Sequence, residues 1–490
     1  MIYKTDRDSL ETYLTDASNF HGNAEMLYIP ETIDELQKII KVCYENVIPI
    51  TISGARTGLT GSAVPLNGVI ISMEKLNKII NIDCENGTAI LQPGVIIDGF
   101  QEEIKNFGFF YAPNPTETNS TIGGNVSTAA SGARTFKYGT TRDYVIRLKI
   151  ILANGEFLEL KRGEIFENNG IIKIRTEQNT SYEVPIYDIQ MPNVKHAAGY
   201  YLKKGMDAID IFIGSEGTLG VVAEIEVGVV RIPEKILGLI VFFDDESLML
   251  DFVDEVRDKS SINNKINYSE NIGISARLIE FFDDKSLDLL RVKFPQIPDE
   301  TCGAIWVEQE YSEQHEDEIL NKWYSIINKY SSLGDFTWTA MNETEHKKLM
   351  DFRHELPLQV YELITKFNSI KIGTDSAVPN KYLKEYYYYI KKQLVESNLI
   401  YFVWGHIGNS HFHANLLSQY DSDLVKAKEI YHNCIAKALE YGGTVSAEHG
   451  IGKMKKEYLL QMYGEEKIGY MKKIKNSLDP KNILGFGNLF

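Results

Sequence analysis

The sequence is poor in cysteine. Its 490 residues include 4 cysteines, and these are scattered: Cys43, Cys84, Cys302 and Cys434. No Cys-x-x-Cys pair occurs, which disfavours a disulfide framework, a cysteine-type zinc site and a cysteine-bound iron–sulfur cluster. Cys43 and Cys434 fall on the apolar stripes of expected helices, so we interpret both as core cysteines.

Long apolar runs and an excess of positive charge are missing too. No apolar segment approaches the ~18–20 residues that span a bilayer, and the N-terminal residues are charged and lack the apolar core of a signal peptide. We therefore expect no integral membrane segment and a cytoplasmic protein, with peripheral membrane attachment as the alternative. The net charge of −17 argues against nucleic acid as a partner and against tight binding to anionic lipid.

The length of the chain, in contrast, is two to three times that of a typical domain, so we expect at least two domains. The expected division is 1–232, 233–421 and 422–490, the last being a helical segment that returns to the first domain. Residues 161–190 are polar and irregular, and we expect them to form a surface insertion in the first domain. From about residue 236, alternating apolar strands and charged helices indicate an α+β second domain.

Periodicity predicts the main helices and strands. Residues 31–46 form an expected amphipathic helix, in which Thr32 and Glu35 have the spacing of a capping box. Further helices are expected at 246–257, 314–330, 343–367, 380–396 and from 422 to Gly442-Gly443. Strands are expected at 47–52, 68–73, 79–82, 88–91, 144–160, 219–231, 238–243 and 303–310.

A glycine- and threonine-rich turn, residues 54–61, follows the expected strand 47–52. Backbone N–H groups in such a turn can converge on phosphate oxygens, because glycine permits close approach and unusual backbone angles. The spacing matches neither a P-loop nor a G-x-G-x-x-G fingerprint, which excludes the Walker and Rossmann motifs. Taken alone, the turn is also compatible with an ordinary loop.

A second segment, residues 111–141, is rich in Gly, Ser, Thr, Asn and Ala. It contains Pro113-Asn114-Pro115, Thr121–Thr128, Gly132 and Lys137-Tyr138-Gly139. Two such loops about 65 residues apart suit a two-ended ligand, with a pyrophosphate on one loop and a ring system on the other. A pair of turn-rich surface loops is the alternative.

In order along the chain, four motifs resemble the FAD-binding type 4 family, the vanillyl-alcohol-oxidase-like flavoproteins. They are Gly54-x-x-Thr57-Gly58-Leu59, Thr121-Ile122-Gly123-Gly124-Asn125, Lys137-Tyr138-Gly139 and Gly214-Ser215-Glu216-Gly217-Thr218-Leu219-Gly220. The resemblance covers about residues 30–490, apart from 161–190. It implies an α+β fold: a two-subdomain FAD-binding domain of the vanillyl-alcohol-oxidase type, and a cap domain with an antiparallel sheet.

The same resemblance implies where FAD binds, with the pyrophosphate on Gly54–Gly61 and the isoalloxazine near Thr121–Thr128. Ala55 and Arg56 stand where some relatives carry the histidine that tethers FAD, which implies non-covalent FAD. The implied cofactor-binding positions are Ser53, Gly54, Ala55, Arg56, Thr57, Gly58, Leu59, Gly61, Ser62, Pro113, Thr121, Gly123, Gly124, Asn125, Ser127, Thr128, Gly132, Tyr138, Gly139, Glu216, Gly220 and Val221.

Histidines gather at His406, His411 and His413, and Glu448 and His449 follow near the C-terminus. In an extended stretch His411 and His413 share a face, whereas His406 reaches the same point only if the intervening turn reverses the chain. Imidazoles and a carboxylate are suitable ligands for Zn²⁺, Mn²⁺ or Fe²⁺. A packed, hydrogen-bonded loop without metal is the alternative.

These segments resemble the Gly-His-x-Gly-Asp-Gly-Asn-x-His and Ser-x-Glu-His-Gly-x-Gly motifs of the D-lactate, D-2-hydroxyglutarate and glycolate dehydrogenase branch. The resemblance implies that His406, His413 and Glu448 hold a divalent metal, with zinc as the first expectation and manganese or iron as alternatives. It further implies His449 as the catalytic base, Asn415 as a polar substrate contact and Arg353 as the arginine that grips the substrate carboxylate.

The loop departs from the branch motif at Asn409, Ser410 and His411. For His411 two interpretations stay open: a metal ligand, or a residue that faces solvent or supports the ligands from outside. The chain end, residues 479–488, matches the ending of the family only in part, which leaves the flavin contact there open.

The implied activity is oxidation of a small D-2-hydroxy acid, resembling D-lactate or else D-2-hydroxyglutarate or glycolate, to the 2-oxo acid. Hydride passes from C2 to the flavin N5, and the electrons leave to a separate acceptor: an electron-transfer flavoprotein, a quinone or a cytochrome. A homodimer is left open. The alternatives are an alkyl-transfer enzyme like the ether-lipid synthases, which Glu448 disfavours because they use a His-rich motif there, and a flavoprotein subunit of an electron-transfer complex.

Overall fold

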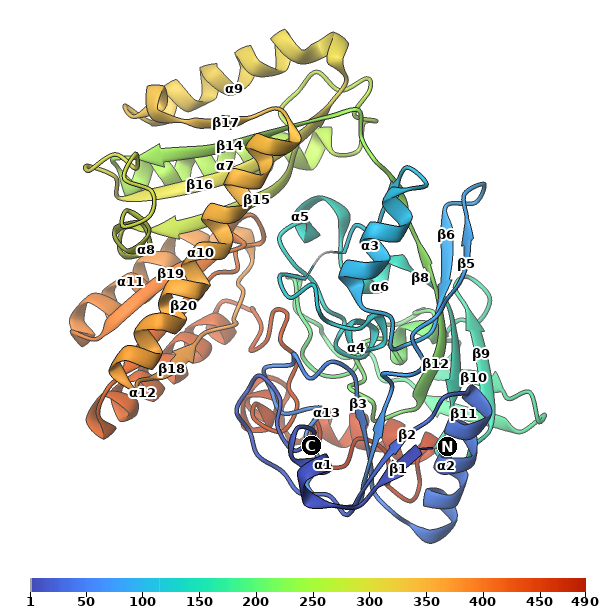
Figure 1. Cartoon of the computed structure of the whole chain (residues 1–490). Coiled ribbons are helices and arrows are strands. Elements are labelled where there is room, and N and C mark those ends of the chain that lie inside the picture. The colour runs from blue at the N-terminus through green and yellow to red at the C-terminus, as the bar shows by residue number, and fades with distance from the viewer. Residues whose placement is uncertain (1, 114) are drawn as a thin grey trace.

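The computed structural model describes residues 2–113 and 115–490 of the chain. Two bodies built on β-sheets lie side by side: in Figure 1 the elements from β1 to β13 lie in one body, and those from β14 (light green) to α12 (orange) lie in the other. Across the described ranges, no helix is both long and apolar enough to cross a membrane.

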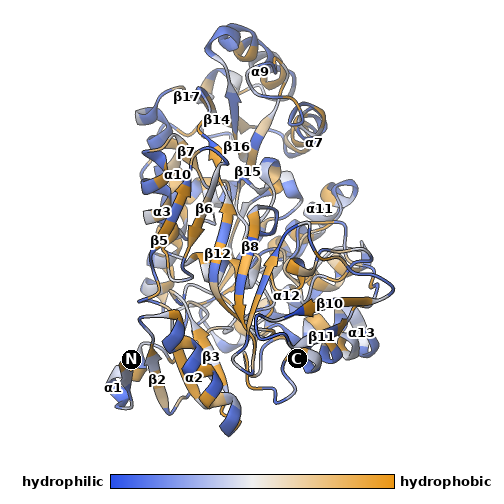
Figure 2. Ribbon diagram, turned by 90° about the vertical axis from the view of Figure 1, so that its right-hand side faces the viewer, coloured by the Kyte–Doolittle hydropathy of each residue, from blue (hydrophilic) through white to orange (hydrophobic). Residues whose placement is uncertain are grey.

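The first body contains a 4-stranded sheet and a 5-stranded sheet. In the smaller sheet the order is β1 (Ile2–Lys4), β2 (Met26–Ile29), β4 (Val69–Ser72), β3 (Ile50–Ser53). The larger sheet is antiparallel, in the order β5 (Ile79–Asp83), β6 (Thr88–Leu91), β12 (Val221–Gly228), β8 (Val145–Ile151), β9 (Phe157–Lys161). On β8 and β12, apolar and hydrophilic residues alternate (Figure 2), as expected when the two faces of a sheet differ.

Helix α2 (Ile33–Asn46) confirms the predicted amphipathic helix. The Thr32 hydroxyl accepts a hydrogen bond from the backbone N–H of Glu35, and the Glu35 carboxylate accepts one from Glu31 N–H. Its buried face, including Leu36 and Cys43, packs in one cluster with Ile50 of β3 and Val69 of β4. The strand β3 is thereby fixed with its C-terminal end leading into the glycine-rich turn.

The second body is a 7-stranded sheet with helices on both faces. Its strand order is β17 (Trp338–Ala340), β14 (Lys235–Phe243), β16 (Gly303–Tyr311), β15 (Ala276–Asp283), β19 (Ile400–Gly405), β20 (His413–Ser418), β18 (Ile370–Gly373). One face packs on α7 (Glu246–Asn263), α9 (Glu316–Tyr330), α11 (Leu383–Ser397) and α12 (Asp421–Glu440). The other packs on α8 (Asp284–Leu290) and α10 (Glu343–Phe367). The apolar side chains of β15 therefore alternate between two cores.

Residues 161–190 differ from the predicted irregular insertion. They contain the hairpin of β10 (Ile171–Arg175) and β11 (Ser181–Pro185). Ile172, Ile174 and Val184 are buried in the core of the first body. Buried apolar residues alternate with more exposed residues over only five positions in each strand, a pattern too short to stand out from its polar surroundings.

The C-terminal segment returns to the first body later than residue 422. Helix α12 packs on the 7-stranded sheet through Ala427 and Cys434. The return is made by α13 (Lys456–Leu478), whose Leu459, Met471 and Ile474 lie in the core of the first body. In Figure 1 this red helix lies behind β3 and β2, and in Figure 2 it lies to the right of them.

Candidate flavin pocket and metal centre

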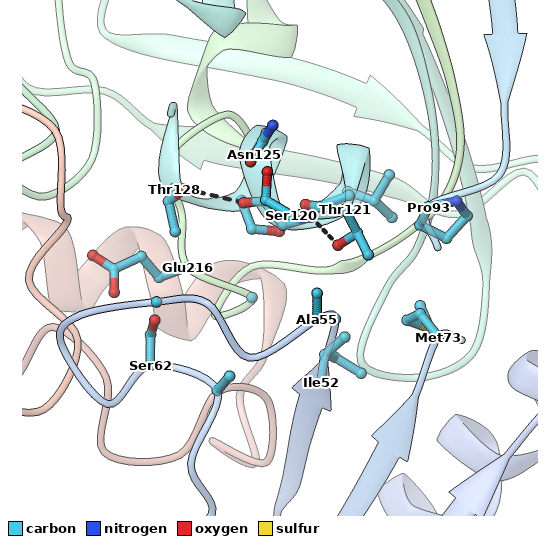
Figure 3. A pocket seen from close by; sticks show the side chains of 18 of the residues that line it. Ile52, Ala55, Ser62, Met73, Pro93, Ser120, Thr121, Asn125, Thr128 and Glu216 are labelled. Atoms are coloured by element: carbon cyan, nitrogen blue, oxygen red, sulfur yellow. Dashed lines mark hydrogen bonds between the residues drawn. The ribbon is translucent and has the colours of Figure 1, made fainter. Parts of the chain in front are cut away.

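The two glycine-rich segments line one cavity. Its volume is about 920 Å³, part of it open to solvent, and its walls come from the turn after β3, from α4 (Ile122–Thr128), from residues 216–222 and from the chain end. In Figure 3, Ala55 and Ser62 lie on one side of the cavity and Ser120, Thr121 and Asn125 on the other. This arrangement favours the interpretation that both loops bind one two-ended ligand over the interpretation that they are independent surface loops.

Most of the implied cofactor positions line the cavity: Gly54, Ala55, Arg56, Thr57, Gly58, Ser62, Thr121, Gly123, Gly124, Asn125, Ser127, Thr128, Glu216, Gly220 and Val221. Ser53, Leu59, Gly61, Pro113, Gly132, Tyr138 and Gly139 do not line it. Ser53 is fully buried, whereas Leu59 is largely exposed. The Tyr138 hydroxyl reaches Glu310 of the second body instead. Asn114 lies outside the described residues.

The segment 111–141, which was expected to form a loop, contains a short helix, α4, and needs its glycines for close packing. A Cβ at Gly123 would lie 2.6 Å from Pro93 Cβ and 2.8 Å from its carbonyl oxygen, and one at Gly54 would lie 2.5 Å from Thr121 Oγ1. The cavity-lining Asn125 Nδ2 and Ser120 Oγ are buried without a hydrogen-bond partner among the described residues. Such atoms fit a polar ligand, because unpaired buried polar groups are costly.

The chain end closes the cavity. Gly485 and Asn488 line it, and Asn488 Nδ2 donates to the carbonyl oxygens of Ser62 and Glu216 at 3.0 Å each. The Glu216 carboxylate accepts from the backbone N–H groups of Ile451 (2.8 Å) and Gly452 (2.7 Å). Burial nevertheless raises the pKa of Glu216 to about 7.

The second candidate site begins at a hairpin. Strands β19 and β20 are antiparallel, with Trp404 opposite His413. Gly405 (φ +139°) and Ser410 (φ +51°) adopt positive φ in the connecting turn. The chain reversal that brings His406 towards His413 is therefore present despite the altered residues at 409–411.

The predicted trio comes together. His406 Nε2 lies 3.3 Å from Glu448 Oε2, and His413 Nε2 lies 3.1 Å from Glu448 Oε1. One ligand atom from each of His406, His411, His413 and Glu448 can be chosen so that all lie within 4.8 Å of one another. This donor set of imidazoles and a carboxylate fits a divalent metal such as Zn²⁺.

His411 is fully buried, so the interpretation that it faces solvent was wrong. Its Nε2 lies 3.3 Å from Asp375 Oδ1 and its Nδ1 lies 3.5 Å from Lys195 Nζ. Burial lowers the pKa of His411 to about 3. The ring is therefore neutral and capable of metal binding. Its contact with Asp375 also helps to hold the cluster in place.

Lys195 joins the cluster without any prediction from the sequence. Its Nζ lies 2.6 Å from Glu448 Oε2, the carboxylate oxygen that also faces His406. Burial by itself raises the pKa of Glu448, but Lys195 and His406 hold it well below its ordinary value. A metal ion at this place would share Glu448 with an ammonium group.

Asp375 holds the loop that carries Glu448 and His449. It accepts hydrogen bonds from Lys455 Nζ (2.7 Å), Ser446 Oγ (2.6 Å) and the backbone N–H groups of Glu448 (3.2 Å) and His449 (3.1 Å). His449 Nδ1 lies 3.4 Å from Asp375 Oδ2. Burial, opposed by Asp375, lowers the pKa of His449 to about 4, so its imidazole is neutral near pH 7, and Asp375 lies where it stabilises the protonated ring.

His449 and Asn415 both lie next to His413. The rings of His449 and His413 are stacked, with centroids 5.3 Å apart. Asn415, two residues further along β20, is buried and donates to His413 O at 3.1 Å. Arg353 of α10 lies with Nε 3.3 Å from Glu280 Oε2, and its Nη1 is buried without a hydrogen-bond partner among the described residues. That free nitrogen can bind a carboxylate oxygen.

Comparisons with known proteins agree with this geometry. A family model described as "FAD binding domain" matches residues 24–161, and one described as "FAD linked oxidases, C-terminal domain" matches residues 266–489. The chain belongs to the FAD-linked oxidase family. FAD is therefore its cofactor, and the protein is an oxidoreductase.

Curated relatives match nearly the whole of this FAD-linked oxidase. It is 28% identical over 489 residues to the glycolate oxidase subunit GlcD of Bacillus subtilis (strain 168), covering 98% of this chain and 92% of that protein. It is 28% identical over 508 residues to the D-lactate dehydrogenase of Anaerostipes hadrus, with 98% and 92% covered.

Solved structures confirm the predicted α+β fold of the vanillyl-alcohol-oxidase type. p-Cresol methylhydroxylase with substrate bound matches with a TM-score of 0.71 at 18% identity, over 99% of this chain and 93% of that chain. Alkyldihydroxyacetonephosphate synthase matches with a TM-score of 0.69 at 16% identity, over 99% and 81%. Matches at these identities show the fold alone.

Several residues of both sites were not predicted from the sequence. Gly485 and Asn488 belong to the chain end, where the partial match to the family is the available signal. Glu280 is a carboxylate between apolar residues in the middle of a strand whose residues are all buried, which is a usable signal. Lys195 stands in no motif that we identified, and only the fold reveals it.

Proposed function

We propose that this FAD-linked oxidase is a dehydrogenase that oxidises a D-2-hydroxy acid to the 2-oxo acid, with non-covalent FAD and a divalent metal. The observation that carries the proposal is the position of His449. A neutral imidazole is stacked on the candidate ligand His413 and lies with Nε2 3.7 Å from Glu448 Oε1. A base beside a metal site is what removal of a hydroxyl proton requires.

When bound, FAD supplies a hydride acceptor, and a metal held by His406, His413 and Glu448 supplies Lewis acidity towards the substrate hydroxyl. Arg353 binds the substrate carboxylate through its free Nη1 and fixes the orientation of C2. Asn415 provides a further polar contact. His449 accepts the hydroxyl proton, and Asp375, which lies against His449 Nδ1, stabilises the imidazolium that results.

The relatives named for glycolate and D-lactate support a small 2-hydroxy acid as the substrate, with D-2-hydroxyglutarate as the larger candidate. The electrons leave to a separate acceptor, for which an electron-transfer flavoprotein, a quinone and a cytochrome are the candidates. The proposed division is an FAD-binding part at 1–232, a cap at 233–421 and a C-terminal segment at 422–490, with α12 of that segment packed on the cap.

The test is anaerobic mixing of the FAD-loaded protein with a panel of D- and L-2-hydroxy acids while the flavin absorbance is followed. We expect D-lactate, glycolate or D-2-hydroxyglutarate to bleach the flavin, and the L-acids not to do so. Removal of divalent metal should abolish the bleaching, and its return should restore it. A protein that is reduced by none of these acids contradicts the proposal and favours the alkyl-transfer alternative.

A further inference from the structure

Glu280 is a carboxylate in an apolar strand. It lies in the middle of β15, on the same face as Leu278 and Phe282, whose side chains pack in the core beneath α10. The residue is 1% exposed. A buried carboxylate is costly unless it is paired, so its partners should account for its position.

Each oxygen of Glu280 has its own partner. Oε1 lies 2.5 Å from His406 Nδ1, and Oε2 lies 3.3 Å from Arg353 Nε. The imidazole Nδ1 and the guanidinium Nε are both donors here, so the carboxylate accepts one hydrogen bond from each of them. His406 therefore donates from Nδ1 to Glu280, which leaves the lone pair of Nε2 for a ligand on the side of Glu448.

Arg353 is fixed in the same way. Its Nε is held by Glu280, while its Nη1 is buried and has no hydrogen-bond partner among the described residues. Because the guanidinium is planar, fixing Nε also fixes the direction of the remaining N–H groups. One carboxylate thus sets the direction of both the imidazole and the guanidinium.

We propose that Glu280 is a positioning residue that couples metal binding to substrate binding, by orienting His406 towards the metal and Arg353 towards the substrate carboxylate. This rests on the proposed function. The two groups lie on different elements, the β19–β20 turn and α10, and among the described residues Glu280 is the only one that contacts both through hydrogen bonds. Loss of Glu280 should therefore weaken metal binding and substrate binding together.

The test variant is Glu280→Gln, because an amide has one acceptor oxygen and cannot accept from both partners. The matched control is Asp283→Asn, three residues along the same strand and equally buried. Asp283 Oδ1 accepts from the backbone N–H groups of Ser286 and Val403, and Oδ2 has no partner, so asparagine can keep both bonds. Co²⁺ serves as the metal probe, since its visible absorption reports the ligand geometry.

We expect Glu280→Gln to bind Co²⁺ about 10- to 100-fold more weakly with an altered absorption spectrum. The KM of the best 2-hydroxy acid should rise at least as much as kcat falls, because Arg353 is no longer held. Asp283→Asn should leave the Co²⁺ affinity, the spectrum and KM unchanged. Glu280→Gln protein with the Co²⁺ affinity and spectrum of the wild type overturns the proposal, as does an equal effect in Asp283→Asn.

If Glu280→Gln does not fold, Arg353→Met tests the same coupling. Among the described residues Arg353 shares no hydrogen bond or ion pair with His413 or Glu448, yet we expect its loss to change Co²⁺ affinity about threefold or more through Glu280. An unchanged affinity and spectrum overturn the proposal. Wild-type protein that binds Co²⁺ but is reduced by no 2-hydroxy acid contradicts the proposed function alone, and the Co²⁺ comparison still decides the role of Glu280.

Discussion

The flavin pocket and the histidine–glutamate cluster differ in how their buried polar groups are paired. In the pocket, Asn125 Nδ2 and Ser120 Oγ have no partner among the described residues. In the cluster, charged groups are matched: Lys195 with Glu448, and Arg353 with Glu280. The pocket is thus shaped to gain hydrogen bonds from a large ligand, whereas the cluster is already balanced in charge, and an incoming cation must compete for Glu448.

Two glutamates express this difference. Burial raises the pKa of Glu216 in the pocket to about 7, while Lys195 and His406 keep the pKa of Glu448 well below its ordinary value. Two backbone N–H groups are weaker compensation for a carboxylate than a lysine and a histidine. Four changes would break or sharpen the comparison.

The largest effect is expected for His449→Ala. Loss of a positioned base should slow flavin reduction by about 10²- to 10⁴-fold, while FAD content and Co²⁺ affinity stay close to those of the wild type. Stopped-flow absorbance under anaerobic conditions measures the rate. His432→Ala, on the exposed side of α12, is the control. An unchanged rate would remove His449 from the mechanism.

Glu216→Gln should change the pH dependence of stability. The folded pKa of Glu216 lies above its unfolded value of 4.5, so its contribution is complete below about pH 4.5 and is lost as pH rises through about 7. The loss amounts to about 3 kcal/mol in the free energy of unfolding. Denaturant titrations of FAD-free protein at about pH 5 and about pH 8 should show this decline in the wild type and a flatter profile in Glu216→Gln. The exposed Glu102→Gln should behave like the wild type.

Gly123→Ala should weaken FAD binding by about 10- to 100-fold, because the added Cβ meets Pro93 and displaces α4 at a cost of about 1–3 kcal/mol. Co²⁺ affinity should not change if the two regions are independent. Flavin fluorescence titration measures FAD binding. Gly99→Ala, where a Cβ meets nothing within 4 Å, is the control. Equal FAD affinity in the two variants would contradict the role of Gly123 in the pocket.

The smallest effect is expected for Lys195→Met. Removing the ammonium beside Glu448 should strengthen Co²⁺ binding about tenfold, because the metal no longer competes with the lysine for the carboxylate. A hydrogen bond between charged groups contributes about 1.5–3 kcal/mol, and the cost of leaving the carboxylate of Glu448 without its lysine partner offsets part of this gain. The exposed Lys203→Met should have no effect. Weaker Co²⁺ binding in Lys195→Met would show that the lysine supports the metal site instead of competing with it.

The sequence predicted regular elements and motif residues well, for physical reasons. The capping pair Thr32 and Glu35 and the long apolar runs at 238–243 and 303–310 carry local signals that tertiary packing did not override. The β10–β11 hairpin was missed because its buried face rests on three or four residues. His411 could not be decided from its neighbours, because its burial depends on Asp375 and Lys195, which are distant in the sequence.

The metal trio was found as a set, but its environment was not. Spacing predicts which side chains share a face, as with His411 and His413, and the turn at Gly405 supplied the reversal that His406 needed. Lys195 and Glu280 come from separate segments, and only the packing of β15, β19 and the loop at 446–450 brings them to the cluster. Charge compensation between segments that are distant in the sequence leaves no local sequence pattern from which it could be predicted.

The return of the chain end also orders events during synthesis. Ile483 and Leu484 lie in the core between α2 and the 4-stranded sheet, and Asn488 binds the turn that begins the flavin pocket. A growing chain therefore cannot complete the core of its first body before residues 483–488 have been made. The seven strands of the second sheet all lie between residues 235 and 418, so that sheet can form before the core of the first body is complete.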